Sequence, residues 1–219
     1  PFYIPIYLDL LATYVFALTG AVGAIQRSYD YIGVFTIAMV AGVGGSILRD
    51  GVFLQRIPLT IADSRYLIVI IVACLTAALV TRFRSGIQMM LVVIDAFGLG
   101  AYAVIGTQAS RDMGVPILGA ALVGMFNSVG GGMLRDIMIR EEPLVFRPSE
   151  FYAIAALAGI AVFVTLDESG IVRPVCGLAA ISTTIAIRLA SVYFGWKTTP
   201  VSRLGWLERP VNRDNQTDR

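Results

Sequence analysis

The chain of 219 residues has no histidine, one lysine (Lys197) and two cysteines, and only 15% of its residues are charged. Without histidine, Ser-His-Asp and Cys-His catalysis and histidine-ligated metal sites are excluded. Cys74 and Cys176 lie inside apolar runs, where cysteine typically behaves as a small buried hydrophobic residue. The sequence has no Walker loop, dinucleotide-binding fingerprint or nucleophile–base pair. We therefore expect no enzyme, no bound cofactor and no resident metal.

Apolar residues dominate the chain: 57% are hydrophobic, and a soluble domain carries about 25% charged residues. Crossing a bilayer takes about 20 largely apolar residues. Seven such runs can be marked, at Ile6–Ile25, Tyr31–Leu48, Tyr66–Thr81, Met90–Ser110, Val115–Ile139, Phe151–Leu166 and Ile171–Phe194. The runs show no strict alternation, which favours helices over barrel strands. The composition therefore predicts a polytopic, all-α membrane protein.

The pattern Val-Gly-Gly-x-x-Leu-Arg-Asp occurs twice, at Val43–Asp50 and Val129–Asp136, with an offset of 86 residues. The same offset relates Asp9 to Asp95, Ala17 to Ala103, Gly20 to Gly106, Gly33 to Gly119, Met39 to Met125 and Tyr66 to Tyr152. An internal repeat of membrane segments is typical of transporter and channel folds.

The repeat divides the chain into residues 1–88 and 89–168, each with three apolar runs, then residues 169–197 with a seventh run, and a polar tail at 198–219. Because three is odd, the second copy enters the membrane from the opposite side, so the repeats are related by a pseudo-two-fold axis in the membrane plane. The predicted fold has seven transmembrane helices, arranged as two inverted three-helix repeats plus a seventh helix.

Basic residues set the orientation, because cytoplasmic loops carry an excess of arginine and lysine. One side receives Arg27, Arg82, Arg84, Arg140, Arg147, Lys197, Arg203, Arg209 and Arg213. The other receives Arg56, Arg65, Arg111 and Arg173. We expect a multi-pass inner-membrane protein with its N-terminus outside and a cytoplasmic C-terminal tail that touches anionic lipid. The dispersed basic residues indicate no binding to nucleic acid.

The two eight-residue segments Val43–Asp50 and Val129–Asp136 are called the octets below, and their glycines have two interpretations. Glycine inside a helix costs about 1 kcal/mol relative to alanine, so Gly44-Gly45 and Gly130-Gly131-Gly132 favour a kink or short unwinding in the second and fifth helices. Such a break offers backbone carbonyls to an ion pathway. The alternative is close helix packing through small residues.

The octets end in two Arg-Asp pairs, Arg49-Asp50 and Arg135-Asp136. A charge at the centre of the membrane costs about 2.5–3.5 kcal/mol on insertion scales, whereas an interfacial charge is cheap. Interfacial anchoring is the alternative interpretation. Topology places Asp9 beside the first pair and Asp95 beside the second, so we predict one Asp/Arg/Asp cluster at each mouth of a path, with gating by salt-bridge breakage.

Uncharged polar residues near the octets are further candidates. We expect Ser46, Asn127 and Ser128 to line the pathway or to bond across helices, with Thr19, Thr107 and Gln108 as weaker candidates. Arg188 has no repeat partner and interrupts the seventh run, so snorkelling or structural pairing is expected there.

The segment Ile94–Gly106 (IDAFGLGAYAVIG), followed by Gly130–Asp136 (GGGMLRD), resembles the prokaryotic trimeric intracellular cation (TRIC) channels. The resemblance implies a homotrimer with one pore per subunit, lined by kinked helices 2 and 5, that conducts monovalent cations, chiefly potassium. The Lys-Glu-Val element of eukaryotic members is missing here. Bacterial proteins described as glycine transporters share the same signature.

The sequence therefore predicts a passive potassium channel. A secondary transporter for a small zwitterion such as glycine is the alternative, since inverted repeats with broken helices suit carriers equally well. A structural or assembly subunit without transport activity is a third possibility.

Overall fold

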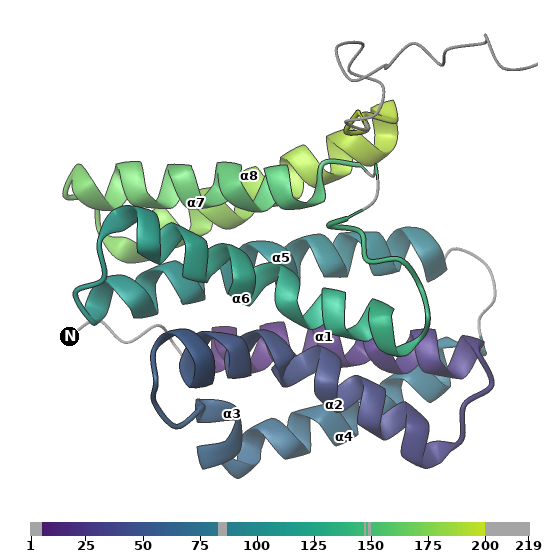
Figure 1. Ribbon diagram of the computed structural model, residues 1–219. Coiled ribbons are helices and arrows are strands. Elements are labelled where there is room, and N and C mark those ends of the chain that lie inside the picture. Colours follow the sequence, from purple (N-terminus) through teal and green to yellow (C-terminus); the bar gives the residue numbers. More distant parts are fainter. Residues whose placement is uncertain (1–5, 83–86, 147, 149, 200–219) are drawn as a thin grey trace, which may run out of the picture.

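The computed structural model describes residues 6–82, 87–146, 148 and 150–199, and helices make up nearly all of this part (Figure 1). The α-helices are α1 (Ile6–Gln26), α2 (Tyr31–Ile47), α3 (Leu59–Ala62), α4 (Ser64–Val80), α5 (Ile87–Asp112), α6 (Ile117–Met138), α7 (Tyr152–Glu168) and α8 (Arg173–Phe194). A π-helix, η1 (Leu48–Phe53), continues α2. The described residues form no strand, apart from an isolated β-bridge between Glu150 and Lys197.

Length and composition make five helices suitable for crossing a membrane: α1, α2 with η1, α5, α6 and α8. The shorter helix α4 is also apolar. The protein is thus an all-helical, multi-pass membrane protein, as predicted.

Each expected run overlaps one of the longer helices, but α3 makes the number of described α-helices eight where seven were expected. This single turn follows Pro58, whose fixed φ suits the start of a helix. The last twenty residues of the expected polar tail lie outside the described residues, as do Arg84 and Arg147.

Helices α1 and α5 hold the bundle together. α1 packs on α2, α4 and α5, and α5 packs on α6, α7 and α8. In Figure 1 the α7–α8 pair lies on the opposite side of the bundle from α3 and α4. The rings of Phe16 and Tyr102 stack between α1 and α5 with their centroids 5.3 Å apart. A hydrophobic core cluster surrounds this stack, so the two helices share one interior.

The octet glycines lie where α2 and α6 cross. A Cβ atom on Gly45 would overlap the backbone oxygen of Asn127, and one on Gly131 would overlap that of Ala41. Gly44 faces Leu134 while Gly130 faces Leu48, so the two helices run antiparallel at the crossing. Only glycine permits backbones to approach this closely.

The unwinding expected at these glycines does not occur. α2 is α-helical to Ile47, and α6 is α-helical through to Met138. The backbone N–H of Leu48 donates to the carbonyls of Gly44 and Gly45, so these oxygens keep helical partners. The irregularity comes one turn later, in η1, where π-helical bonding begins. Close packing, the second interpretation of the glycines, is therefore the geometry that the structure has.

We predict that Gly45→Ala destabilises the protein, because the added methyl group meets the backbone of α6, which cannot move as a flexible side chain does. Overpacking of this kind costs about 1–3 kcal/mol, so the melting temperature in detergent should fall by about 5 °C. The control is Gly177→Ala, whose Cβ makes an ordinary 3.6 Å contact with Val104. Equal melting temperatures for the two variants would contradict the close-contact interpretation.

Candidate functional site

The first charge cluster lies where η1 meets α1 and α4. The Arg49 guanidinium grips the Asp50 carboxylate with two hydrogen bonds, Nε to Oδ1 and Nη2 to Oδ2, each 2.7 Å long. Arg56 Nε donates to Asp50 Oδ1 over 2.9 Å. On the other side, Asp9 Oδ2 is 3.8 Å from Arg49 Nη2 and accepts a 2.9 Å hydrogen bond from Tyr66 Oη. The first cluster therefore balances two arginines against two aspartates.

Burial makes the Arg49–Asp50 pair unusual. Arg49 is 1% exposed and Asp50 is fully buried. A charge removed from water needs a partner with good geometry, and the two parallel hydrogen bonds supply it. The wide turn of η1 carries both residues, and π-helical turns are frequent at functional sites. The side chains of this pair therefore face the interior of the bundle and not its surface.

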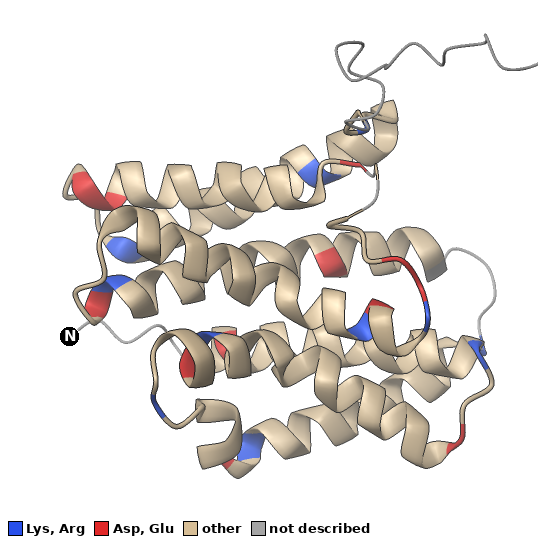
Figure 2. Ribbon diagram, in the orientation of Figure 1, with Lys and Arg blue, Asp and Glu red and all other residues tan. Residues whose placement is uncertain are grey.

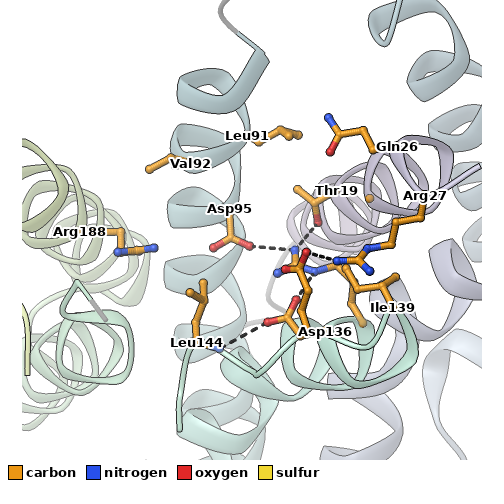
Figure 3. A pocket seen from close by; sticks show the side chains of 13 residues that line it. Thr19, Gln26, Arg27, Leu91, Val92, Asp95, Asp136, Ile139, Leu144 and Arg188 are labelled. Atoms are coloured by element: carbon orange, nitrogen blue, oxygen red, sulfur yellow. Dashed lines mark hydrogen bonds and ion pairs between the residues drawn. The ribbon is translucent and has the colours of Figure 1, made fainter. Parts of the chain in front are cut away.

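The second charge cluster lies between α6, α5 and α1. Arg135 Nε donates to Asp136 Oδ1 over 2.8 Å. Arg135 Nη1 donates to Thr19 Oγ1 over 3.0 Å and lies 3.5 Å from Asp95 Oδ1. Figure 3 shows these contacts, together with the 3.4 Å hydrogen bond from the Leu144 backbone N–H to Asp136. The structure thus brings together each predicted Asp/Arg/Asp set.

A cavity of about 390 Å³ opens on the second cluster (Figure 3). Its lining consists of Thr19, Gly23, Gln26, Arg27, Leu91, Val92, Asp95, Arg135, Asp136, Ile139, Glu141, Leu144 and Arg188. Three arginines face three carboxylates across it, so its formal charge is zero. Three ion pairs, Arg27 with Glu141, Arg135 with Asp136 and Arg135 with Asp95, include five of these six charges. Figure 2 shows that other charged residues gather mainly at helix ends.

Between the clusters the interior is polar but uncharged. Tyr102 Oη donates to the Gly42 carbonyl over 2.8 Å and lies 2.7 Å from Thr13 Oγ1. Asn127 Nδ2 donates to the Tyr102 carbonyl over 2.7 Å, while its Oδ1, also buried, has no hydrogen-bond partner in the part of the chain that the structure describes. Ser46 is fully buried on the facing helix. Hydroxyl and amide groups thus connect α1, α2, α5 and α6 in the bundle centre.

Some candidates bond within their own helices. Ser128 Oγ donates to the Met125 carbonyl and Thr107 Oγ1 to the Ala103 carbonyl, each over 2.8 Å. Gln108 is buried on α5. Arg188 is also buried, 4% exposed, so it does not snorkel to the membrane surface.

Sequence reasoning missed Arg56, Tyr66, Tyr102 and Thr13. A signal existed for Tyr66, because Tyr152 matches it at the repeat offset. Arg56 was assigned only to a loop, and Tyr102 had no repeat partner, since Phe16 stands at the equivalent position. Their roles depend on contacts between helices, which spacing along one helix does not reveal.

A multi-pass helical bundle with ion-paired charges inside it defines a membrane transport protein as the class, since such charges are costly and mark transport paths. A family model described as "Glycine transporter" matches the chain twice, over residues 6–82 and 92–168. The chain belongs to this family. One match lies in each segment expected to form a repeat.

Relatives agree with this assignment. A membrane protein of Deinococcus radiodurans, described as UPF0126, is 30% identical over 94% of this chain and 91% of its own length. The UPF0126 inner membrane protein YadS of Escherichia coli is 32% identical over 85% of this chain and 90% of its own.

The fold is shared with a TRIC trimeric intracellular cation channel orthologue from Rhodobacter sphaeroides, with a TM-score of 0.82 and 29% identity over 87% of this chain and 98% of that one. The expected resemblance to the TRIC channels is thereby confirmed. These relatives are membrane and channel proteins, in agreement with the prediction that the chain is not an enzyme.

We predict that Asp50→Asn strongly destabilises the protein, because it leaves the buried Arg49 without its bidentate partner. Breaking a buried pair from one side costs about 3–5 kcal/mol, so the melting temperature should fall by about 10 °C. Asp63→Asn is the control: Asp63 pairs with Arg65 at the exposed start of α4, where asparagine caps equally well. Similar melting temperatures for both variants would contradict this account.

Proposed function

We propose that the protein is a passive channel for monovalent cations, chiefly potassium, in the inner membrane, assembled as a homotrimer with one pathway per subunit. The observation that carries the proposal is the fold shared with the Rhodobacter sphaeroides TRIC channel orthologue over nearly its whole length. The two buried charge clusters on α2–η1 and α6 support it, because each lies beyond one end of the same crossing.

The proposed architecture is a pair of inverted repeats, with α1, α2 and α4 in one, α5, α6 and α7 in the other, and α8 unpaired. Reciprocal contacts support it. Gly45 approaches Asn127 as Gly131 approaches Ala41, and Gly44 meets Leu134 as Gly130 meets Leu48. In each reciprocal pair the residues exchange roles at the repeat offset of 86, as a two-fold relation requires. The antiparallel crossing of α2 and α6 agrees with opposite entry of the two copies.

The pathway proposed here runs along the α2–α6 crossing. Its shape is set by the octet glycines, Gly44, Gly45, Gly130, Gly131 and Gly132, and its oxygen ligands come from Ser46, Asn127 and Ser128. The Oδ1 of Asn127 is well placed among these oxygens, because it is a buried acceptor that has no hydrogen-bond partner within the described residues.

An arginine beside a cation path repels its cargo unless a carboxylate neutralises it. Arg49 and Arg135 each bond to the aspartate that follows, and Asp9 and Asp95 lie 3.8 and 3.5 Å away. The contacts to Asp9 and Asp95 are the longer ones, so they are the contacts that we propose to break when a mouth opens. Asp50 and Asp136 then keep the arginines neutralised throughout.

The proposed orientation keeps the N-terminus outside and the C-terminus in the cytoplasm, which places the second cluster at the inner mouth. Among the described residues, Arg27, Arg82, Arg140 and Lys197 follow helix ends on the proposed cytoplasmic side. Arg56, Arg65, Arg111 and Arg173 lie at the opposite helix ends. This distribution follows the excess of basic residues in cytoplasmic loops.

A second candidate function is secondary transport of a small zwitterion such as glycine. The description of the matching family favours it, as does the cavity at the second cluster, which offers both arginine and carboxylate groups at zero net charge. A zwitterion needs one group of each sign within a few ångströms.

Flux measurements on purified protein in proteoliposomes separate the two candidates. A channel should carry potassium down its gradient without any amino acid, at a rate that rises with potassium concentration well beyond carrier turnover. Empty liposomes serve as the negative control. Saturable glycine exchange without ionic current would overturn the channel proposal, and large potassium currents without glycine would overturn the carrier.

A charge swap tests the proposed role of the second cluster. We predict that Asp95→Arg and Arg135→Asp each reduce flux at least about tenfold, since each leaves like charges buried together. The double variant Asp95→Arg/Arg135→Asp restores opposite charges across the same 3.5 Å contact and should recover part of the flux. If the double variant is as inactive as either single variant, the contact has no role in opening the pathway.

A further inference from the structure

The two charge clusters differ in the hydrogen bonding of one pair of equivalent tyrosines. Tyr66 and Tyr152 occupy equivalent repeat positions. In the first cluster Tyr66 Oη donates to Asp9 Oδ2 over 2.9 Å and holds the carboxylate in place. The equivalent bond, from Tyr152 to Asp95, is missing: the buried Tyr152 Oη has no hydrogen-bond partner within the described residues. A buried hydroxyl without a partner is costly, so something in the structure opposes this bond.

Arg188 is the group that lies against Tyr152. Its guanidinium carbon is 5.2 Å from the centroid of the Tyr152 ring, at cation–π distance. Arg188 Nη1 donates to the Glu150 carbonyl over 3.0 Å, while its Nε is buried and has no partner among the residues that the structure describes. No carboxylate of the described chain lies within ion-pair distance of Arg188, although it is 4% exposed. An unpaired cation in a membrane helix marks a functional group.

Arg188 also acts on Asp95. Arg135 and Arg188 both attract the Asp95 carboxylate electrostatically, and all three residues line the same cavity. Figure 3 shows Asp95 drawn between Arg188 of α8 and the contacts of Arg135. The Arg135–Asp95 contact is 3.5 Å, against 2.8 Å for Arg135–Asp136, so Asp95 is loosely held.

We call the Tyr66–Asp9 hydrogen bond, and the equivalent bond that Tyr152 could make to Asp95, the latch of each cluster. We propose that Arg188 prevents the latch from forming in the second cluster, because it holds the Tyr152 ring and competes for Asp95. Because α8 has no counterpart in the repeat, Arg188 acts at one mouth only. The seventh helix thereby makes two otherwise equivalent mouths unequal, and the mouth at the second cluster is the one that opens more readily. This inference rests on the proposed function, because it assumes that a mouth without the latch lets more ions through.

The test uses the full chain in proteoliposomes. Arg188→Gln frees Tyr152 to bond with Asp95, and flux should fall about tenfold, the effect of one hydrogen bond to a charged group. Adding Tyr152→Phe removes the hydroxyl and should return flux to within about twofold of wild type. The matched control is Arg188→Gln with Tyr193→Phe, which removes an exposed hydroxyl on α8 outside both clusters and should restore nothing. If Arg188→Gln/Tyr152→Phe stays as low as Arg188→Gln alone, Arg188 is merely structural and the proposal fails.

A second readout does not depend on the cargo. Tyr152→Phe should leave the melting temperature in detergent almost unchanged in the wild-type background, where the hydroxyl has no partner. In the Arg188→Gln background it should lower the melting temperature by about 3 °C, because a bond has formed there. Equal shifts in both backgrounds overturn the latch. If the melting-temperature shifts differ between the two backgrounds but the wild-type protein moves neither potassium nor glycine, the proposed function is overturned and the latch is retained. Arg188→Met, which keeps an unbranched stem, replaces Arg188→Gln if that variant does not fold.

Discussion

The backbone contact between α2 and α6 is the constraint on which the rest of the interior depends. Gly45 and Gly131 allow these antiparallel helices to touch, and a side chain at either position would push them apart. One turn beyond each glycine, at about 1.5 Å per residue, the chain carries Arg49 or Arg135. The crossing therefore places one arginine on each side of a single contact, inside the bundle, where each must find carboxylates.

These carboxylates stabilise the buried arginines inside a membrane protein. Arg49 is almost fully buried, and its bidentate bond to Asp50 replaces the water that it has lost. Asp9 and Asp95 lie farther from the arginines than the neighbouring aspartates do. Each cluster thus combines a tight pair with a looser third charge, and only the looser contact can exchange partners at moderate cost.

The octets were informative because glycine and arginine leave few options in an apolar run. They predicted an Asp/Arg/Asp set at each end, and the structure brings both sets together. They also favoured a kink or a short unwinding at the glycines, and the unwinding does not occur: α2 and α6 stay helical there, and their backbones pack closely. Arg188 illustrates a different gap. Its position was visible, but its contact with Tyr152 joins α8 to α7 and cannot be deduced from one segment.

The sequence by itself determined the apolar runs, the duplication and the all-helical membrane class, since each follows from local composition and a fixed offset. Tertiary structure alone decided which partner each charge took. Tyr66 bonds to Asp9, whereas its repeat equivalent Tyr152 lies under Arg188. The physical reason is the distance over which each effect operates. The hydropathy of a segment depends only on its own residues, whereas a hydrogen bond is made or lost when its two atoms move by about half an ångström. Helix packing sets that distance, and it is the packing of α8 that brings Arg188 against the Tyr152 ring.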